Sequence, residues 1–305
     1  MDQKIFRNIE GHRTLEEWYD RFLNFTNCDT KIDQVPSDFG SIHVLLAGNR
    51  SNPPLVCLHA MMTSSAHLLS EIEKLTDHYF LIIPDLPGQS VKGIPRRFSY
   101  SDYSLSDWLE CIIRLYQLSE IDLLGVSLGG FVALRYSISF PGKVRNLVLI
   151  VPAGIVNGSM LTGTKKMMWP FLRYKLSPTE QNLRKFLEPI LTTWNTEWGH
   201  YMGDAFRFFK PDMRVPPVAS DAELKSIEAR TLVVAADSDI SFPGAPLVER
   251  VSLLIDSVET ELLKRCKHCP PTTNQFREWL AGIVRRFLKV METLGNQPKT
   301  QKKVS

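Results

Sequence analysis

The chain has 305 residues, of which 44% are hydrophobic and 23% are charged, so it can bury a large core and is not expected to be disordered. Its 36 lysine and arginine residues against 33 acidic residues give a formal charge of +3, which is too small to indicate nucleic-acid binding. Five cysteines at scattered positions do not resemble a disulfide framework.

The N-terminal region predicts a helix and no targeting segment. Residues 1–30 are expected to form a helical lead-in, because apolar side chains recur three and four positions apart between residues 13 and 27. The first residues carry mixed charge and lack the apolar segment of a secretory signal. No run in the sequence reaches membrane-spanning length, so we expect no membrane insertion. The scattered cysteines make a reducing cytoplasm the expected compartment.

Short apolar runs along the rest of the chain predict strands. Helical patterns lie between most of them, and this alternation is typical of an α/β fold with a mostly parallel sheet covered by helices on both faces. The predicted strands are residues 41–47, 54–59, 79–83, 121–124, 144–151, 231–236 and 259–263.

One long segment interrupts this alternation. Residues 154–228 contain no clear strand, and we expect them to form a helical cap inserted between two parts of the core, residues 31–153 and 229–291. Residues 292–305 read as a flexible polar tail. The cap is rich in aromatic residues that either line a pocket or, as we expect for most of them, pack the cap onto the core. They are Trp169, Phe171, Tyr174, Phe186, Trp194, Trp198, Tyr201, Phe206, Phe208 and Phe209.

The most specific motif is G-x-S-x-G at Gly125–Gly129, directly after an apolar run and before a helical pattern. Flanking glycines leave room for a serine at a sharp strand-to-helix turn, so Ser127 is the candidate nucleophile. The amide of Leu128, at the start of the helix, is one candidate oxyanion donor. The same pattern also fits a glycine-rich turn that has no catalytic role, so the residues elsewhere in the chain must distinguish the two interpretations.

A nucleophilic serine needs a histidine as base and an acid to orient that histidine. In the chain order serine, acid, histidine, two histidines lie downstream of Ser127. His200 falls in the aromatic cap, whereas His268 follows the last predicted strand and is our candidate. Asp239 and Asp237 both follow the strand at residues 231–236; spacing favours Asp239, and Asp237 is the second choice.

The second oxyanion donor should come from the loop after the strand that ends near His59, and the Met61 amide is our candidate. His59 itself is expected to hydrogen-bond this loop as a structural histidine. Cys266 and Cys269 have C-x-x-C spacing, but no second ligand pair completes a zinc site, so we interpret them as packing residues.

These motifs together resemble the alpha/beta-hydrolase superfamily, in its cap-bearing carboxylesterase-like and proline-iminopeptidase-like branch, from about Ser41 to Leu288. Further blocks support the resemblance in the family's order. They are Leu58-His59-Ala60 at the oxyanion loop, Asp85-Leu86-Pro87-Gly88-Gln89-Ser90, the strand and acid at residues 231–239, and Lys267-His268-Cys269-Pro270-Pro271. The sequence departs from the family pattern at Ala60, Ala236 and Lys267, each of which stands where the family usually has glycine.

The resemblance implies a serine hydrolase that cleaves small or medium, largely apolar carboxylic esters through Ser127, His268 and Asp239, with the Met61 and Leu128 amides as oxyanion hole. Such acyl transfer requires no cofactor or metal. A carbon–carbon bond hydrolase or a cofactor-free perhydrolase on the same triad remains an alternative. So does a non-catalytic small-molecule receptor, because the three lost glycines add side chains near the site. The oligomeric state is left open.

Overall fold

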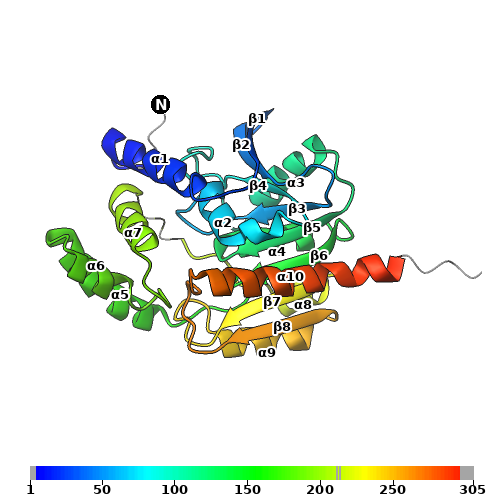
Figure 1. The fold of residues 1–305 in the computed structure, drawn as a ribbon. Helices are drawn as coiled ribbons and strands as arrows, with labels where there is room; N and C mark the ends of the chain where they lie inside the picture. The colour runs from blue at the N-terminus through cyan, green and yellow to red at the C-terminus, as the bar shows by residue number, and fades with distance from the viewer. Residues whose placement is uncertain (1–4, 211, 213, 296–305) are drawn as a thin grey trace, which may run out of the picture.

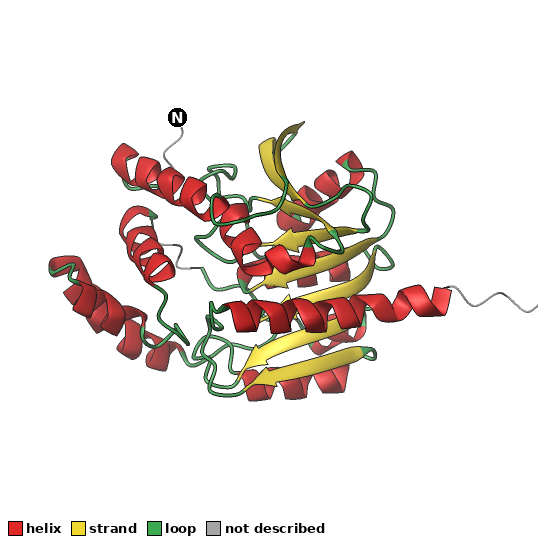
Figure 2. Ribbon diagram, in the orientation of Figure 1, coloured by secondary structure: helices red, strands yellow, loops and turns green. Residues whose placement is uncertain are grey.

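The computed structural model describes residues 5–210, 212 and 214–295 and has one eight-stranded sheet with helices on both faces (Figures 1 and 2). The strands are β1 (Thr30–Ser37), β2 (Gly40–Ala47), β3 (Pro54–Leu58), β4 (Phe80–Pro84), β5 (Ile121–Val126), β6 (Val144–Ile150), β7 (Arg230–Ala236) and β8 (Val258–Leu263). The helices are α1 (Ile9–Leu23), α2 (Ser65–Ile72), α3 (Ser104–Leu115), α4 (Leu128–Ser139), α5 (Met160–Leu176), α6 (Glu180–Leu187), α7 (Thr196–Phe208), α8 (Asp221–Lys225), α9 (Gly244–Leu254) and α10 (Asn274–Gly295), with a short 3₁₀ turn, η1 (Glu73–Leu75).

The strand order is β1-β2-β4-β3-β5-β6-β7-β8. From β4 to β8 every neighbouring pair is parallel, whereas β1 and β2 form an antiparallel hairpin that joins the sheet at β4. The carboxyl ends of the parallel strands point toward the side of the molecule that carries α5, α6 and α7 (Figure 2). The expected fold class, α/β with a mostly parallel sheet, is confirmed.

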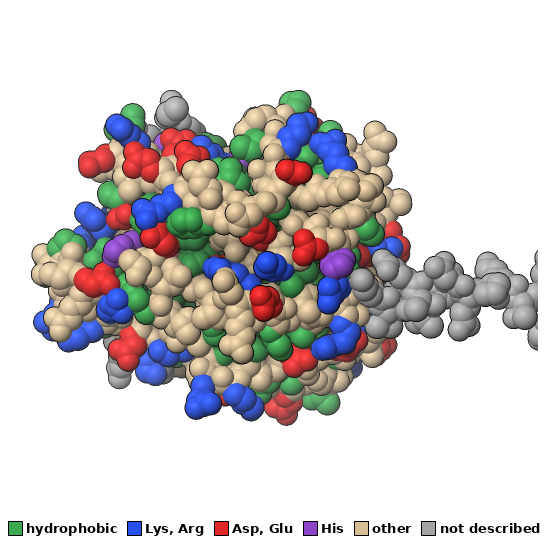
Figure 3. All heavy atoms as spheres, viewed as in Figure 1, with side chains coloured by type: hydrophobic (Ala, Val, Ile, Leu, Met, Phe, Trp, Pro, Cys, Tyr) green, Lys and Arg blue, Asp and Glu red, His purple; other side chains and the backbone are tan. Residues whose placement is uncertain are grey.

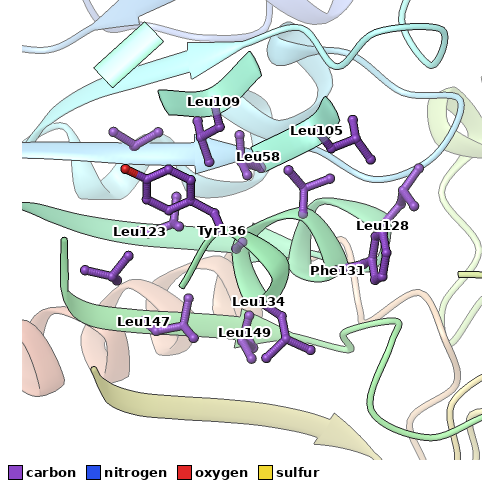
Figure 4. Close-up of a cluster of buried hydrophobic side chains, with 14 of the residues drawn as sticks. Leu58, Leu105, Leu109, Leu123, Leu128, Phe131, Leu134, Tyr136, Leu147 and Leu149 are labelled. Atoms are coloured by element: carbon purple, nitrogen blue, oxygen red, sulfur yellow. The ribbon is translucent and has the colours of Figure 1, made fainter. Parts of the chain in front are cut away.

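The apolar runs of the central strands are continuous because both of their faces are buried. In β5, Leu123 packs with α3 and α4 on one face, and Leu124 packs with α2 and α10 on the other. The same alternation holds in the neighbouring strand, at Leu147 and Val148 of β6. Figure 4 shows the first of these two cores, where Tyr136 and other side chains of α4 meet leucines from β5 and β6. Two separate cores therefore fix the sheet from both sides.

Two elements differ from the expectation. Helix α1 begins at Ile9 rather than near residue 13, because the Asn8 side chain accepts a hydrogen bond from the Gly11 amide (2.7 Å) and caps the helix. Strand β1 was not expected at all; most of its residues are polar and none is fully buried, as suits an edge strand. Of the expected tail, residues 292–295 belong to α10, and the remainder lies outside the described residues, as do residues 1–4.

Helices α5, α6 and α7 lie between β6 and β7 in the chain and over the carboxyl edge of the sheet; we call these three helices the cap. Helix α7 packs against α1, where Tyr201 and Ala205 share a cluster with Tyr19 and Phe22 (Figure 1). Helix α8 also falls within residues 154–228, but its Leu224 packs in the core cluster together with α9. In the described part of the chain, no helix combines the length and the apolar composition needed to cross a bilayer.

A buried carboxylate fixes the loop that follows β4. Asp85 accepts hydrogen bonds from His43 Nδ1 (2.8 Å), from the backbone amide (3.0 Å) and hydroxyl (2.6 Å) of Ser65, and from the Ser90 hydroxyl. Burial opposes ionisation of Asp85, but the hydrogen bond from His43 and the others hold its pKa down at about 2. The charged carboxylate therefore ties β2 and the start of α2 to the β4 loop.

We expect Asp85→Asn to lower the free energy of unfolding by about 3 kcal/mol or more at pH 7, because the amide would leave buried donors without an acceptor. Asp77→Asn, at an exposed aspartate, should change it by less than about 0.5 kcal/mol. The Asp85 pKa is depressed in the folded state, so its stabilisation is present above the unfolded value of 3.8 and is lost as the pH falls toward 2. Urea unfolding at several pH values measures this; an equal effect of both substitutions at pH 7 would contradict it.

Candidate active site

Ser127 occupies the sharp turn between β5 and α4. Its backbone φ of 52° and ψ of −111° lie in a region that non-glycine residues rarely adopt. The turn closes this tightly because Gly125 and Gly129 have no side chain. A Cβ on Gly125 would collide with the carbonyl oxygen of Gly129, and a Cβ on Gly129 with that of Leu58. The local sequence thus presents the Ser127 side chain at the carboxyl edge of the sheet.

Three side chains from three loops meet at this edge. Ser127 follows β5, Asp239 follows β7 and His268 follows β8. Ser127 Oγ lies 3.0 Å from His268 Nε2, and His268 Nδ1 lies 2.7 Å from Asp239 Oδ2. Because the carboxylate accepts a hydrogen bond from Nδ1–H, Nε2 of the neutral ring faces the serine hydroxyl as an acceptor.

The Asp239 carboxylate is held on both of its oxygens. While Oδ2 faces His268, Oδ1 accepts hydrogen bonds from the amides of Ser241 (2.7 Å) and Phe242 (3.1 Å). Its side chain is fully buried, and the Phe242 ring stands edge-on to the imidazole at 5.3 Å between ring centroids. These contacts fix the orientation of the carboxylate and of the imidazole before any substrate binds.

The two alternatives weighed from the sequence lie elsewhere. Asp237 is exposed, and its Oδ1 accepts hydrogen bonds from the Ser238 hydroxyl (2.9 Å) and the Cys266 amide (3.2 Å), so it stabilises the turn after β7. Hydrogen bonds to the carboxylate lower the pKa of Asp237. His200 lies on the cap, where it contacts Glu180 (2.8 Å) and stays half exposed. The structure thus brings Asp239 and His268 together with Ser127. It does not bring Asp237 or His200 to that site.

Of the two candidate oxyanion donors, Leu128 follows Ser127 directly and Met61 lines the same cavity. Leu128 is the first residue of α4, and the amides of a helix's first turn have no acceptor within the helix. Met61 lines the same cavity as Ser127, in the loop after β3. His59 stabilises this loop: its Nε2 accepts a hydrogen bond from the Leu86 amide, so Nδ1 carries the proton and donates it to the Ala60 carbonyl, both at 2.8 Å. Burial lowers the pKa of His59, consistent with the neutral ring that these bonds require.

The cap also contacts the oxyanion loop. The hydroxyl of Tyr201, on α7, donates a hydrogen bond to the carbonyl of Met62, which has a φ of 53°. The Tyr201 ring lies over the buried ring of His67, with 3.8 Å between centroids. Burial raises the pKa of Tyr201, so its hydroxyl keeps the proton that it donates. The cap therefore holds the strained residue next to the candidate donor Met61.

A mostly apolar cavity of about 430 Å³ opens beside Ser127 and His268. The core side of its wall consists of residues from α2 and α10 and from the ends of β5 and β6 and the loops after β3, β5, β6, β7 and β8. The cap side comes mainly from α7, with Met167 of α5 and with Ile190 and Leu191 of the segment after α6. Its apolar lining includes Met61, Met62, Leu68, Ile72, Val126, Ile150, Val151, Met167, Ile190, Leu191, Met202, Ala205, Phe206, Ile240, Phe242, Phe276 and Leu280. Among the described residues that line it there is no lysine or arginine, and Glu71 is the one acidic side chain.

The charge of Glu71 is paired within the protein. Its Oε1 accepts hydrogen bonds from Trp198 Nε1 of the cap (2.6 Å) and from Arg277 Nη2 of α10 (2.8 Å), and its Oε2 from Arg277 Nε (3.0 Å). This network joins the cap, α2 and α10 at the wall of the cavity. The one acidic side chain of the described lining is therefore neutralised by a partner within the protein.

The aromatic residues of the cap do not divide simply between lining a pocket and packing the cap onto the core. Trp198, Tyr201 and Phe206 line the cavity, while Phe186 packs inside the cap. Trp169 does neither, since it is 72% exposed on α5.

Glu71 and Val151 had not been singled out from the sequence. Val151 directly follows β6 and has a φ of 42° that a β-branched residue rarely adopts, and no local pattern signals such a conformation.

The three residues that stand where the family usually has glycine take different positions in the structure. Ala60 lines the cavity, so its methyl group narrows it. Lys267 turns away from the imidazole, since its Nζ donates a hydrogen bond to the Glu188 carbonyl (2.5 Å). Ala236 is buried at the end of β7. The described residues contain no group of three or more His, Cys, Asp or Glu side chains that could hold a metal, and burial raises the pKa of Cys269 to about 12.

Comparison with known proteins agrees with this arrangement. A family model described as the alpha/beta hydrolase fold matches residues 53–274. Carboxylesterase YbfK of Bacillus subtilis is 24% identical over 277 residues, which cover 88% of this chain and 91% of that protein. A 2-hydroxy-6-oxo-2,4-heptadienoate hydrolase of Pseudomonas putida is 26% identical over 265 residues, covering 80% and 92% of the two chains.

Solved structures agree on the fold. The crystal structure of naproxen esterase from Bacillus subtilis superposes with a TM-score of 0.76 at 19% identity, over 92% of this chain and 99% of that one. The core and the cap together are thus similar to a known architecture along nearly the whole chain.

Proposed function

The chain belongs to the alpha/beta hydrolase fold family, and we propose that it is a serine hydrolase that cleaves carboxylic esters by acyl transfer. The observation that carries the proposal is the hydrogen-bonded series Ser127, His268 and Asp239, whose serine and histidine line an apolar cavity. Carboxylesterases are among the relatives that match most of the chain. Serine, histidine and aspartate in these contacts supply a nucleophile, a base and an orienting acid.

The proposed reaction has two steps. In the first, Ser127 Oγ attacks the ester carbonyl carbon while His268 Nε2 takes the hydroxyl proton, and the Leu128 and Met61 amides donate to the oxygen that becomes negative. The C–O bond to the alcohol then breaks, and His268 gives the proton to the departing oxygen. In the second step water attacks the acyl-serine with His268 again as base, which releases the acid and restores Ser127. Asp239 keeps the imidazole in the required tautomer and stabilises its protonated form.

The cavity favours a neutral, apolar acyl or alcohol group. Burying a carboxylate without a cationic partner is costly, and no lysine or arginine lines this cavity among the described residues. The P. putida relative is named for a dienoate, a substrate that carries a carboxylate. Carbon–carbon bond cleavage of such an acid by the same three residues is therefore our second candidate function. The described lining of the cavity, which offers no cation to a carboxylate, favours ester cleavage over it.

Two esters that differ only in charge would test this substrate class. We expect kcat/KM for p-nitrophenyl hexanoate to exceed that for the p-nitrophenyl monoester of adipic acid by about 100-fold or more at pH 7, because the terminal carboxylate would enter the cavity unpaired. Initial rates from nitrophenolate release, with Ser127→Ala protein as the blank, measure the ratio.

Equal kcat/KM values for the two esters would contradict the apolar assignment. Turnover of a 2-hydroxy-6-oxo-dienoate, with no turnover of either ester, would favour the second candidate. Tight binding of an ester that is never hydrolysed would favour the non-catalytic receptor.

A further inference from the structure

The cap carries an apolar surface that faces away from the cavity. Four of the large hydrophobic side chains that the described chain exposes to solvent lie on α5: Trp169 is 72% and Leu176 86% exposed, with Met168 and Leu172 beside them at 47% and 42%. We call these four residues the docking face. No other helix in the described chain exposes a tryptophan to this extent.

Helical geometry gathers these side chains on one side of α5. At about 100° per residue, Trp169, Leu172 and Leu176 fall within an arc of about 60°, with Met168 at its border. The opposite side of the same helix carries Met167 and Phe171, which pack into the cap. Helix α5 therefore has two apolar sides, of which one is covered by protein and one is not.

Cations border the docking face on both sides. By the same geometry Lys166 and Arg173 lie along one edge and Lys175 along the other, and all three are exposed. Helix α5 contains no acidic residue, and from Met160 to Leu187 the sequence has six lysine or arginine residues against one acidic residue, Glu180. Basic side chains gather at the lower left of Figure 3, where the cap lies.

Two acidic side chains, Asp204 and Glu180, lie near this helix, and both are paired within the protein. Asp204 accepts a hydrogen bond from Trp18 Nε1 (2.9 Å) and contacts Arg207 (3.5 Å). Glu180 contacts Arg184 at 2.9 Å and His200 at 2.8 Å, both within the cap. Neither carboxylate therefore neutralises the cations that border the docking face.

We propose that the docking face binds the protein to an anionic lipid surface. Tryptophan and leucine flanked by lysine and arginine match a membrane interface, where the apolar groups enter the acyl boundary and the cations meet phosphates. A second copy of the chain fits the same face poorly, because a two-fold interface would bring equivalent cations together. Charge complementarity thus selects an anionic membrane as the occupant.

Docking in this way would place α5 between the lipid and the cavity. Met167, on the covered side of the same helix, lines the cavity that opens beside Ser127. The docking itself does not depend on the proposed function.

Vesicle sedimentation tests the proposal on the full-length protein. We expect wild-type protein to bind vesicles of phosphatidylcholine mixed with phosphatidylglycerol, and to bind phosphatidylcholine vesicles at least about tenfold more weakly at low salt. The pair Trp169→Ser and Leu176→Ser should lower the partition coefficient on the mixed vesicles by about tenfold or more. Lys166→Glu with Arg173→Glu should do the same and weaken the dependence on salt.

Matched controls are available on helices α8 and α9, outside the cap. Leu253→Ser, at a leucine of α9 that is 75% exposed, and Lys225→Glu, at an exposed lysine of α8, should leave vesicle binding unchanged. Equal loss in these controls would overturn the proposal, as would absence of wild-type binding to the anionic vesicles. A dimer in light scattering that Trp169→Ser converts to a monomer would assign the face to a second copy instead.

A separate readout keeps docking distinct from catalysis. Hydrolysis of a short water-soluble ester without vesicles should be the same in wild-type protein and in the Trp169→Ser and Leu176→Ser variant. Retained vesicle binding with no hydrolysis of any ester would contradict the proposed function and leave the docking face supported.

Discussion

Replacing Ser127 by alanine is expected to lower kcat for a neutral apolar ester by about 10⁴- to 10⁶-fold, close to the level left by binding and the oxyanion donors alone. The substitution removes the oxygen that would form the acyl-enzyme, while the neighbouring glycines keep the turn closed. Because serine at this position already adopts a φ of 52°, alanine adopts the same strained turn and the fold should be retained. Steady-state kinetics and the far-ultraviolet circular dichroism of both proteins measure this.

A covalent probe would identify the reacting atom directly. A fluorophosphonate should add once to the wild-type chain, with the Ser127 oxygen bonding to phosphorus and fluoride leaving, and should not add to Ser127→Ala. Ser241→Ala is the matched control, since Ser241 lines the same cavity without contacting His268 through its hydroxyl in the described structure, and it should keep the adduct. Intact-mass spectrometry reads all three proteins; an adduct on Ser127→Ala would overturn the assignment of the nucleophile.

The second large effect concerns the acid. Asp239→Asn should lower kcat/KM by about 10⁴-fold, because an amide turned toward His268 offers N–H instead of a carboxylate and favours the wrong imidazole tautomer. The two amides of Ser241 and Phe242 can still bond the remaining carbonyl oxygen, so the loop should keep its shape. Kinetics on a single neutral ester, with thermal unfolding as the measure of stability, give both quantities.

Asp237→Asn is the control for this substitution. Asp237 follows the same strand two residues earlier, but it is exposed and bonds only the turn that contains Cys266. We expect it to lower kcat/KM by less than about tenfold. A larger loss in Asp237→Asn than in Asp239→Asn would mean that the acid has been assigned to the wrong residue.

The parts of this molecule that the sequence predicts best are those set by local pattern. Apolar runs of four to eight residues located the central strands because both faces of those strands are buried, and the glycines around Ser127 marked its turn because only they fit there. Strand β1 escaped notice because an edge strand needs no apolar run. The choice between Asp237 and Asp239 remained open because both leave the same strand, and only the direction of each side chain separates them.

The cap resisted prediction for a different reason. Its aromatic composition is visible in the sequence, but which ring faces the cavity, the cap interior or solvent depends on how three helices pack far from their sequence neighbours. Trp198 contacts Glu71, 127 positions away, and Tyr201 contacts Met62, 139 positions away. No periodicity within α7 encodes such partners.

The bond from Tyr201 to the Met62 carbonyl also limits how this protein can be re-engineered. Exchanging the cap for that of a relative would alter the shape of the cavity and, in the same step, remove the tie on the loop that carries the Met61 amide. A chimera could therefore accept a new ester and still turn it over slowly, unless the transplanted helix restores a hydroxyl at that point. A change of the cap would thus alter substrate selectivity and rate together, because Tyr201 both lines the cavity and bonds the backbone carbonyl of Met62.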